Sequence, residues 1–146
     1  MAAQNKDFYD HMVVSIKYWL DNKGKKNKFS QHIKWAPEMF KLACQLSLEK
    51  AVILEDKAKF AVTVSYFISP FDMFPEALAG VIGYADDLVL LAYVLKLTLP
   101  NIDKELLERY WKHDEKLTDI VNNILNDADE MIGKMLFEKL KSLVDY

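Results

Sequence analysis

Residues 66–91 read YFISPFDMFPEALAGVIGYADDLVLL, and this stretch decides the fold. Two apolar segments are interrupted by Pro, Gly and acidic residues, which are the residue types that start and stop helices. A Ser-Pro-x-Asp sequence opens the interruption, a Pro-Glu pair follows, and a Gly and an Asp-Asp pair precede the second apolar run. The stretch therefore predicts helices that meet at a tight, central apolar corner.

Four carboxylates lie in this stretch, and no Lys or Arg occurs from residue 60 to residue 95. They are Asp72, Glu76, Asp86 and Asp87. Each lies at a predicted helix start, where unpaired backbone N–H groups and the helix dipole favour negative charge. Helix capping thus accounts for all four acids, at about 0.5–2 kcal/mol per cap.

The same four acids are also a candidate binding site. Helix starts joined by short turns bring carboxylates close together, and their mutual repulsion has to be offset by a cation, a basic partner or water. Oxygen ligands of this kind suit Mg²⁺ or Ca²⁺. The candidate metal ligands are Asp72, Asp86 and Asp87. Capping and cation binding both stay open at this point.

The composition favours helices throughout the chain. Of 146 residues, 51% are hydrophobic and 28% are charged, as in an ordinary globular protein. Only four Gly and four Pro are present, which leaves little material for the tight turns of a β-fold. We expect an all-α fold in which residues 1–146 form a single compact domain of about six or seven helices.

Three helices are predicted before the corner. The first covers 6–21 and ends at Gly24, which we expect in the left-handed conformation. The second opens near Pro37, because Pro is favoured in a first helical turn. The third covers 51–68, and its apolar second half, FAVTVSYFI, is expected to be buried on all sides.

After the corner, an apolar helix headed by Asp86 and Asp87 is stopped by Pro100. The rest of the chain carries an apolar stripe in steps of three and four residues, which is a heptad pattern. Its members are Leu106, Tyr110, His113, Leu117, Ile120, Ile124, Ala128, Met131 and Met135. One helix of about 40 residues would be about 60 Å long, so we expect a break near 126–127 or at Gly133. The stripe also leaves a homodimer open.

The motifs of known enzymes are absent from the sequence. Asp86-Asp87 resembles the Asp-rich motif of helical prenyl-transfer enzymes, but Leu90 and Leu91 occupy the place of the further acid. His113 precedes an Asp, as in His-Asp phosphohydrolases, but it falls on the apolar stripe and is interpreted as a packed histidine. Cys44, the single cysteine, lies among apolar residues and is expected to be a buried structural thiol. We do not expect an enzyme.

Charge and hydropathy bear on the partners. The net charge is −3, but residues 22–28 (NKGKKNK) form a basic loop close to Phe29 and Trp35. The loop could touch anionic lipid, whereas a nucleic-acid partner is not expected from one such patch. The longest uncharged runs, 60–71, 77–85 and 88–95, are too short to span a bilayer. No signal peptide is expected, and we place the protein in the cytoplasm or at a membrane surface.

At the corner the chain resembles the YkvA-like family of small helical domains, whose function is unknown. The family pattern is Tyr-x-x-Ser-Pro-x-Asp-x-x-Pro-[Asp/Glu] followed by Gly-x-x-Asp-Asp. The matching positions are Tyr66, Ser69, Pro70, Asp72, Pro75, Glu76, Gly83, Asp86 and Asp87. The longer spacer after Glu76 is similar to the variant appended to certain membrane RING ubiquitin ligases, but the RING cysteines are absent. The resemblance covers about 60–95.

The resemblance implies an all-helical domain whose relatives often occur near membranes, and it implies no reaction, cofactor or catalytic residue. We therefore expect a soluble binding or adaptor module with a protein partner. One alternative is a peripheral membrane protein that docks through an apolar hairpin at 60–99. Another is a Mg²⁺- or Ca²⁺-dependent activity at the clustered carboxylates.

Overall fold

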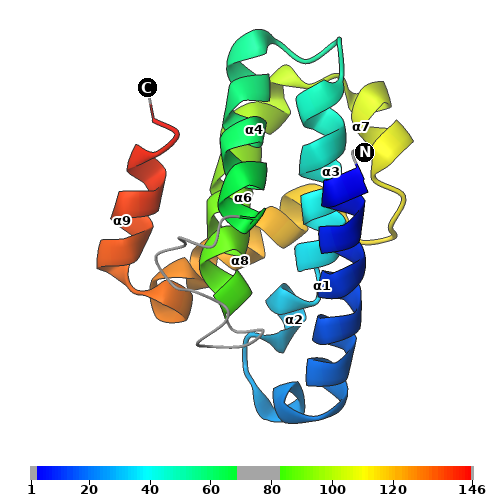
Figure 1. Cartoon of the computed structure of the whole chain (residues 1–146). Helices are drawn as coiled ribbons and strands as arrows, with labels where there is room; N and C mark the ends of the chain where they lie inside the picture. Colours follow the sequence, from blue (N-terminus) through cyan, green and yellow to red (C-terminus); the bar gives the residue numbers. More distant parts are fainter. Residues whose placement is uncertain (1–2, 69–82, 146) are drawn as a thin grey trace.

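A computed structural model describes residues 3–68 and 83–145. Helices and turns make up these residues, with no strand among them, so the all-α prediction is confirmed (Figure 1). The helices are α1 (Ala3–Asp21), the 3₁₀ turn η1 (Lys23–Lys26), α2 (Ser30–Ile33), α3 (Ala36–Leu48), α4 (Leu54–Ile68), α6 (Tyr84–Thr98), the 3₁₀ turn η3 (Leu99–Asn101), α7 (Lys104–Tyr110), α8 (Leu117–Ile132) and α9 (Lys134–Ser142).

Helix α6 lies at the centre of the fold, where it packs against α3, α4, α8 and α9 (Figure 1). Every residue from 83 to 92 is buried. Exposing a helix that is apolar on all sides to water costs more free energy than exposing an amphipathic one. Such a helix is therefore buried among other helices. The apolar run after the Asp-Asp pair thus forms the core helix of the protein.

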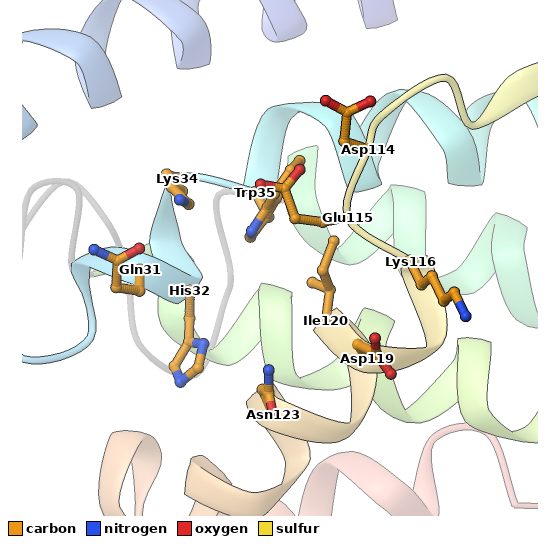
Figure 2. A pocket seen from close by; sticks show the side chains of 10 residues that line it. All are labelled: Gln31, His32, Lys34, Trp35, Asp114, Glu115, Lys116, Asp119, Ile120 and Asn123. Carbon is orange, nitrogen blue, oxygen red and sulfur yellow. The ribbon is translucent and has the colours of Figure 1, made fainter.

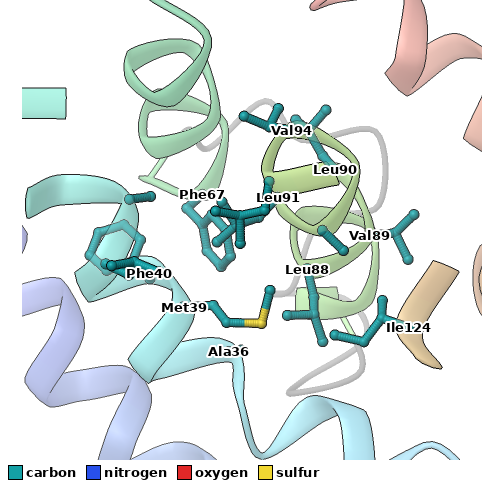
Figure 3. Packing of buried hydrophobic residues seen from close by; sticks show 14 of the residues in the cluster. Ala36, Met39, Phe40, Phe67, Leu88, Val89, Leu90, Leu91, Val94 and Ile124 are labelled. Atoms are coloured by element: carbon teal, nitrogen blue, oxygen red, sulfur yellow. The ribbon is translucent and has the colours of Figure 1, made fainter. Parts of the chain in front are cut away.

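Large side chains from three other helices close around α6. Met39 and Phe40 come from α3, Phe67 comes from α4 and Ile124 comes from α8, all at 0–1% exposure (Figure 3). The ring centroids of Phe40 and Phe67 lie 5.2 Å apart in an edge-on arrangement, which aromatic pairs prefer. This packing fixes α4 against α3 on one side of α6.

Two helix starts follow from the sequence. Pro37 lies in the first turn of α3 and is followed by Glu38, which confirms the predicted start. Asp103 precedes α7, and its carboxylate accepts a hydrogen bond from the backbone N–H of Glu105 at 3.2 Å. Such a cap satisfies an N–H group that has no partner inside the helix.

The prediction for Gly24 is wrong. Among the described residues only Gly133 has a positive φ, and Gly24 lies in the 3₁₀ turn η1. A Cβ atom at Gly24 would lie 2.6–2.8 Å from three ring carbons of Trp19. Gly occurs here because the backbone turns back closely over the Trp19 ring, not because the chain needs a left-handed conformation.

Helix α4 is less buried than expected. It begins at Leu54 rather than at residue 51, and Ala61 and Ser65 in its second half are exposed. The apolar residues of this half that face inward are Phe60 and Phe67, at 0% and 1% exposure. Burial on all sides occurs instead at residues 83–92, which include the first part of α6.

The C-terminal stripe is interrupted twice. The break at Gly133 is confirmed, whereas residues 126–127 lie inside α8. A second break, which the pattern did not predict, is the loop 111–116 between α7 and α8. Leu106, Leu117, Ile120, Ile124 and Ala128 are buried, but Met135 is 77% exposed. The heptad stripe is therefore the inner face of separate short helices.

Candidate functional site

Asp86 and Asp87 lie in the first turn of α6, as predicted, and both are 0% exposed. They follow Gly83, which has a right-handed helical backbone (φ −60°, ψ −17°). Burying carboxylates among apolar helices is costly unless hydrogen bonds or opposite charges compensate. The positive end of the α6 dipole is one compensating field, in agreement with the helix-start interpretation.

Tyr66 joins this pair of acids from the neighbouring helix. Its hydroxyl donates a hydrogen bond to Oδ2 of Asp86 at 3.1 Å, which links α4 to α6 across the corner. The resemblance placed Tyr66 and Asp86 in one signature, and the fold brings them into contact although they are 20 residues apart. Ser69, Pro70, Asp72, Pro75 and Glu76 fall outside the described residues.

The candidate metal site is described only in part. Within 3–68 and 83–145, no group of three or more His, Cys, Asp or Glu side chains is arranged to hold a metal ion. Asp72 lies outside these ranges, so the set Asp72, Asp86 and Asp87 stays a prediction. The described pair is fully buried, and the prediction that Asp72, Glu76, Asp86 and Asp87 bind a partner stays a prediction.

Of the proposed apolar hairpin at 60–99, the described residues 83–92 lie inside the protein. Leu88, Leu90 and Leu91 are 0% exposed because they form the core (Figure 3). None of the described helices has the length and apolar character that crossing a membrane requires. A membrane contact through α6 would require the core to open.

A polar pocket of about 500 Å³ lies between α2 with residues 34–35, the loop 111–116 and the start of α8. Figure 2 shows His32 of α2 on one side of it and Asp119 and Asn123 of α8 on the other. Nε2 of His32 is 2.7 Å from Oδ2 of Asp127, which ties α2 to α8. The lining carries both signs of charge, so we assign no ligand class to this pocket.

His113 is packed as expected, but in a loop rather than on a helical stripe. Its ring centroid lies 4.6 Å from that of Trp111 and 5.4 Å from that of Trp35. Nε2 of His113 is 3.5 Å from Oε2 of Glu38, whose Oε1 accepts a 2.6 Å hydrogen bond from the Tyr9 hydroxyl. Burial, and then the bond to Glu38, raise the pKa of Tyr9 to about 12. This cluster joins α1, α3 and the loop 111–116.

The basic loop is tied to the rest of the protein. Nζ of Lys28 is 2.7 Å from Oε2 of Glu130 on α8, and it also lies over the Phe29 ring at 5.1 Å from the centroid. These contacts partly neutralise the loop and hold it against α8. The anionic-lipid interpretation of residues 22–28 stays a prediction.

Sequence reasoning missed an apolar surface at the turn between α3 and α4. Leu48, Ile53 and Leu54 are 69%, 52% and 82% exposed, and we call these three residues the apolar tip. The turn is held by Val52, which is buried, and by a hydrogen bond from the Tyr110 hydroxyl to Glu49. This bond lowers the pKa of the Glu49 carboxyl. The consecutive apolar residues 52–54 were the available signal.

Comparison with known proteins places the corner in a family context. Residues 56–93 match a family described as "Protein of unknown function (DUF1232)", a range that includes Tyr66, Gly83, Asp86 and Asp87. The chain is also similar to "Uncharacterized protein ORF9" of Methanothermobacter thermautotrophicus. The two are 27% identical over 116 residues, which is 78% of this chain and 80% of the relative. No solved structure matches the chain.

Proposed function

We propose that the protein is an adaptor of the YkvA-like type, which binds other proteins and catalyses no reaction of its own. The match at 56–93 falls on the same residues as the YkvA-like signature, which supports that family placement. Neither description of the similar proteins names a reaction. A buried thiol at Cys44 suits a reducing compartment, so we place the adaptor in the cytoplasm, free or at a membrane surface.

The apolar tip is the observation that carries the proposal. Single exposed apolar residues are normal on a protein surface, but here three large ones occur within the seven-residue segment 48–54. Glu49, the acid of the segment, is bonded to Tyr110, and Asp56, two residues after the segment, accepts a 3.2 Å hydrogen bond from Asn101. Lys50 within the segment and Glu55 directly after it are also exposed, so the three apolar side chains lie beside one charge of each sign.

The apolar tip lies on a rigid turn, which suits it to a pocket on another protein. The flanking turn is fixed by backbone bonds from Val52 to Glu49 and from Lys57 to Ile53, at 3.2 Å and 3.0 Å. Ordering the tip on binding therefore costs little entropy, which favours affinity. Complete burial of one leucine contributes about 1.5–3 kcal/mol, so Leu54 alone is worth about 10- to 100-fold in affinity.

Photo-crosslinking tests this proposal. A photoreactive amino acid placed at position 54 in the intact chain, in cells of its own organism, should give adducts of defined mass with one partner protein. The same amino acid at Asn122, which is exposed on α8, should not give these adducts. Leu54→Ser should lower the binding of that partner at least about tenfold, whereas Val14→Ser, at a site 69% exposed, should not.

Other outcomes distinguish the alternatives. An adduct between two copies of the chain would support the homodimer instead. Flotation of the protein with phosphatidylcholine–phosphatidylserine vesicles, lost in Leu54→Ser, would support peripheral membrane attachment in place of the adaptor function. Identical adducts at positions 54 and 122 would exclude the apolar tip as a specific surface.

Divalent-cation binding at the corner is a second candidate function, favoured by the complete burial of two adjacent carboxylates, Asp86 and Asp87. A ligand that binds only the folded state raises the melting temperature. Millimolar Mg²⁺ or Ca²⁺ should then raise it, and the double variant Asp86→Asn, Asp87→Asn should remove the rise. No shift with either ion would eliminate this candidate.

A further inference from the structure

The junction between α8 and α9, far from residues 66–91 in sequence, has a second apolar surface. Gly133 ends α8 and precedes α9 with φ 86° and ψ 145°, so the chain turns sharply there. An open hollow of about 640 Å³ lies over the end of α8 and the first turns of α9, and we call it the corner groove. Its lining residues are Ile132, Gly133, Lys134, Met135, Leu136 and Lys139.

The floor of the corner groove is apolar and adaptable. Met135 is 77% exposed, and Ile132 and Leu136 are half-buried beside it. Methionine is flexible and polarizable, which suits it to surfaces that bind varied apolar groups. The space above Gly133 is open, because a Cβ atom built there would meet nothing within 4 Å. A side chain from outside can therefore enter.

The rim of the corner groove is basic. Lys134 and Lys139 line it together with four uncharged residues, and neither lysine takes part in an ion pair among the described residues. Three nearby acids are occupied elsewhere: Glu130 by Lys28, Glu138 by Lys141 and Asp127 by His32. The remaining acid of this turn, Asp129, does not line the groove. Both lysines are therefore available to pair with carboxylates of a partner.

We propose that the corner groove binds a short acidic, apolar segment of a partner protein. An apolar side chain of the segment packs on Met135 and Leu136, and flanking carboxylates pair with Lys134 and Lys139. Opposite charges across an interface fix its register and speed association. A hollow lined by apolar side chains and two lysines matches an acidic, apolar peptide, whereas a bilayer meets flat or convex surfaces.

This second surface rests on the proposed adaptor function but not on the apolar tip. The tip lies where α3 meets α4, at the top of Figure 1, and the corner groove lies where α8 meets α9, at the left side. Two partners can therefore be held at once without overlap. Joining two partners is what distinguishes an adaptor from a simple binding domain.

The probe for the test is a fluorescein-labelled amphipathic peptide of about 12 residues, with leucines at helical spacing and glutamates between them. We expect it to bind the full chain and to shift the NMR amide signals of 132–139. A peptide of the same apolar pattern with lysine in place of glutamate should not bind. No shift at 132–139, or equal binding of the two peptides, would overturn the proposal.

Variants assign the binding to the corner groove. Lys134→Glu with Lys139→Glu should weaken peptide binding at least about tenfold, because two exposed pairs become repulsive. The matched control is Lys25→Glu with Lys26→Glu, which changes the net charge equally at exposed positions on η1. An equal loss in both double variants would mean that total charge alone attracts the peptide, and the groove would be rejected.

Two further arms separate the possible failures. Leu54→Ser should leave peptide binding unchanged. If crosslinking finds no partner at the tip while the peptide still binds, the tip alone is refuted. If the protein floats with phosphatidylcholine–phosphatidylserine vesicles through Lys134 and Lys139 and ignores the acidic peptide, the corner groove is a lipid contact and the proposal is wrong.

Discussion

Gly24 has only a hydrogen atom where other residues have a side chain, and this allows the backbone after α1 to pass close to the Trp19 ring. An added Cβ would come within 2.6 Å of the Trp19 ring, and Trp19 is only 9% exposed, so the ring has little room to move. We predict that Gly24→Ala destabilises the protein by about 1–3 kcal/mol, as overpacking does. Equilibrium urea unfolding measures the change. Lys25→Ala is the control, and a loss below about 0.5 kcal/mol at Gly24 would contradict the steric argument.

Cys44 should be chemically silent in the folded protein. Its side chain is 1% exposed, and burial raises the pKa of the thiol to about 11. The thiolate is the reactive form, so at pH 8 its population falls about a hundredfold or more below that of an ordinary thiol. We predict that Ellman's reagent modifies the native protein at least about a hundredfold more slowly than the urea-unfolded chain. Rapid native modification would show that α3 opens readily.

At the scale of the element, α6 should carry the largest share of the stability. Leu88 and Leu91 are 0% exposed and touch the helices on both sides. We predict that Leu88→Ala or Leu91→Ala costs about 2–5 kcal/mol, from lost burial and the cavity left behind. Leu97→Ala, at a position 38% exposed on the same helix, should cost far less. Equal losses in urea unfolding would mean that α6 is not the core.

The corner at Gly133 depends on backbone conformation rather than on space. Its φ of 86° and ψ of 145° lie close to a region that only glycine adopts readily, while a Cβ would meet no neighbour within 4 Å. We predict that Gly133→Ala and Gly133→Asn each destabilise the protein by about 1–3 kcal/mol. Asn gives no relief, because its preferred positive-φ conformation has a smaller ψ. Retained stability in urea would indicate that α8 and α9 had merged into one helix.

For the whole molecule, the sequence predicts where helices begin and end better than which elements pack against them. Local residue types account for the all-α class, for the Pro37 start of α3 and for the break at Gly133, because capping and backbone preferences act within one turn. Asp86 and Asp87 were placed correctly at the start of α6 for the same reason. Their burial could not be read from the sequence, since it depends on which helices cover α6.

The features that were missed depend on contacts between distant residues. The loop 111–116 interrupts a regular apolar stripe. Trp111 follows the last residue of α7, and its ring centroid lies 5.6 Å from that of Trp35, which precedes α3. Lys134 and Lys139 form a basic rim only because neighbouring acids pair with Lys28 and Lys141. Periodicity records which face of a helix is apolar, but not which helix, loop or ion meets that face.

Two tyrosines at distant contacts make the stability of the whole protein sensitive to alkaline pH. Tyr9 joins α1 to Glu38, and Tyr93 joins α6 to Asp145 at 2.8 Å. Burial, followed by the carboxylate partner, raises the pKa of each from 10.0 to about 12. The folded state thus favours the neutral phenol. The contribution of each tyrosine to the free energy of unfolding is complete below pH 10 and is lost as the pH rises towards 12.

We therefore predict that the free energy of unfolding falls as the pH rises from 10 to 12, measured by urea titration at each pH. The double variant Tyr9→Phe, Tyr93→Phe should be less stable than the parent at pH 9 by about 0.5–1.5 kcal/mol per lost hydrogen bond. Its stability should nevertheless fall less steeply with pH, because the two groups that ionise are gone. Tyr18→Phe, at a position 71% exposed, should keep the parental slope. An unchanged slope in the double variant would show that other groups control the alkaline transition.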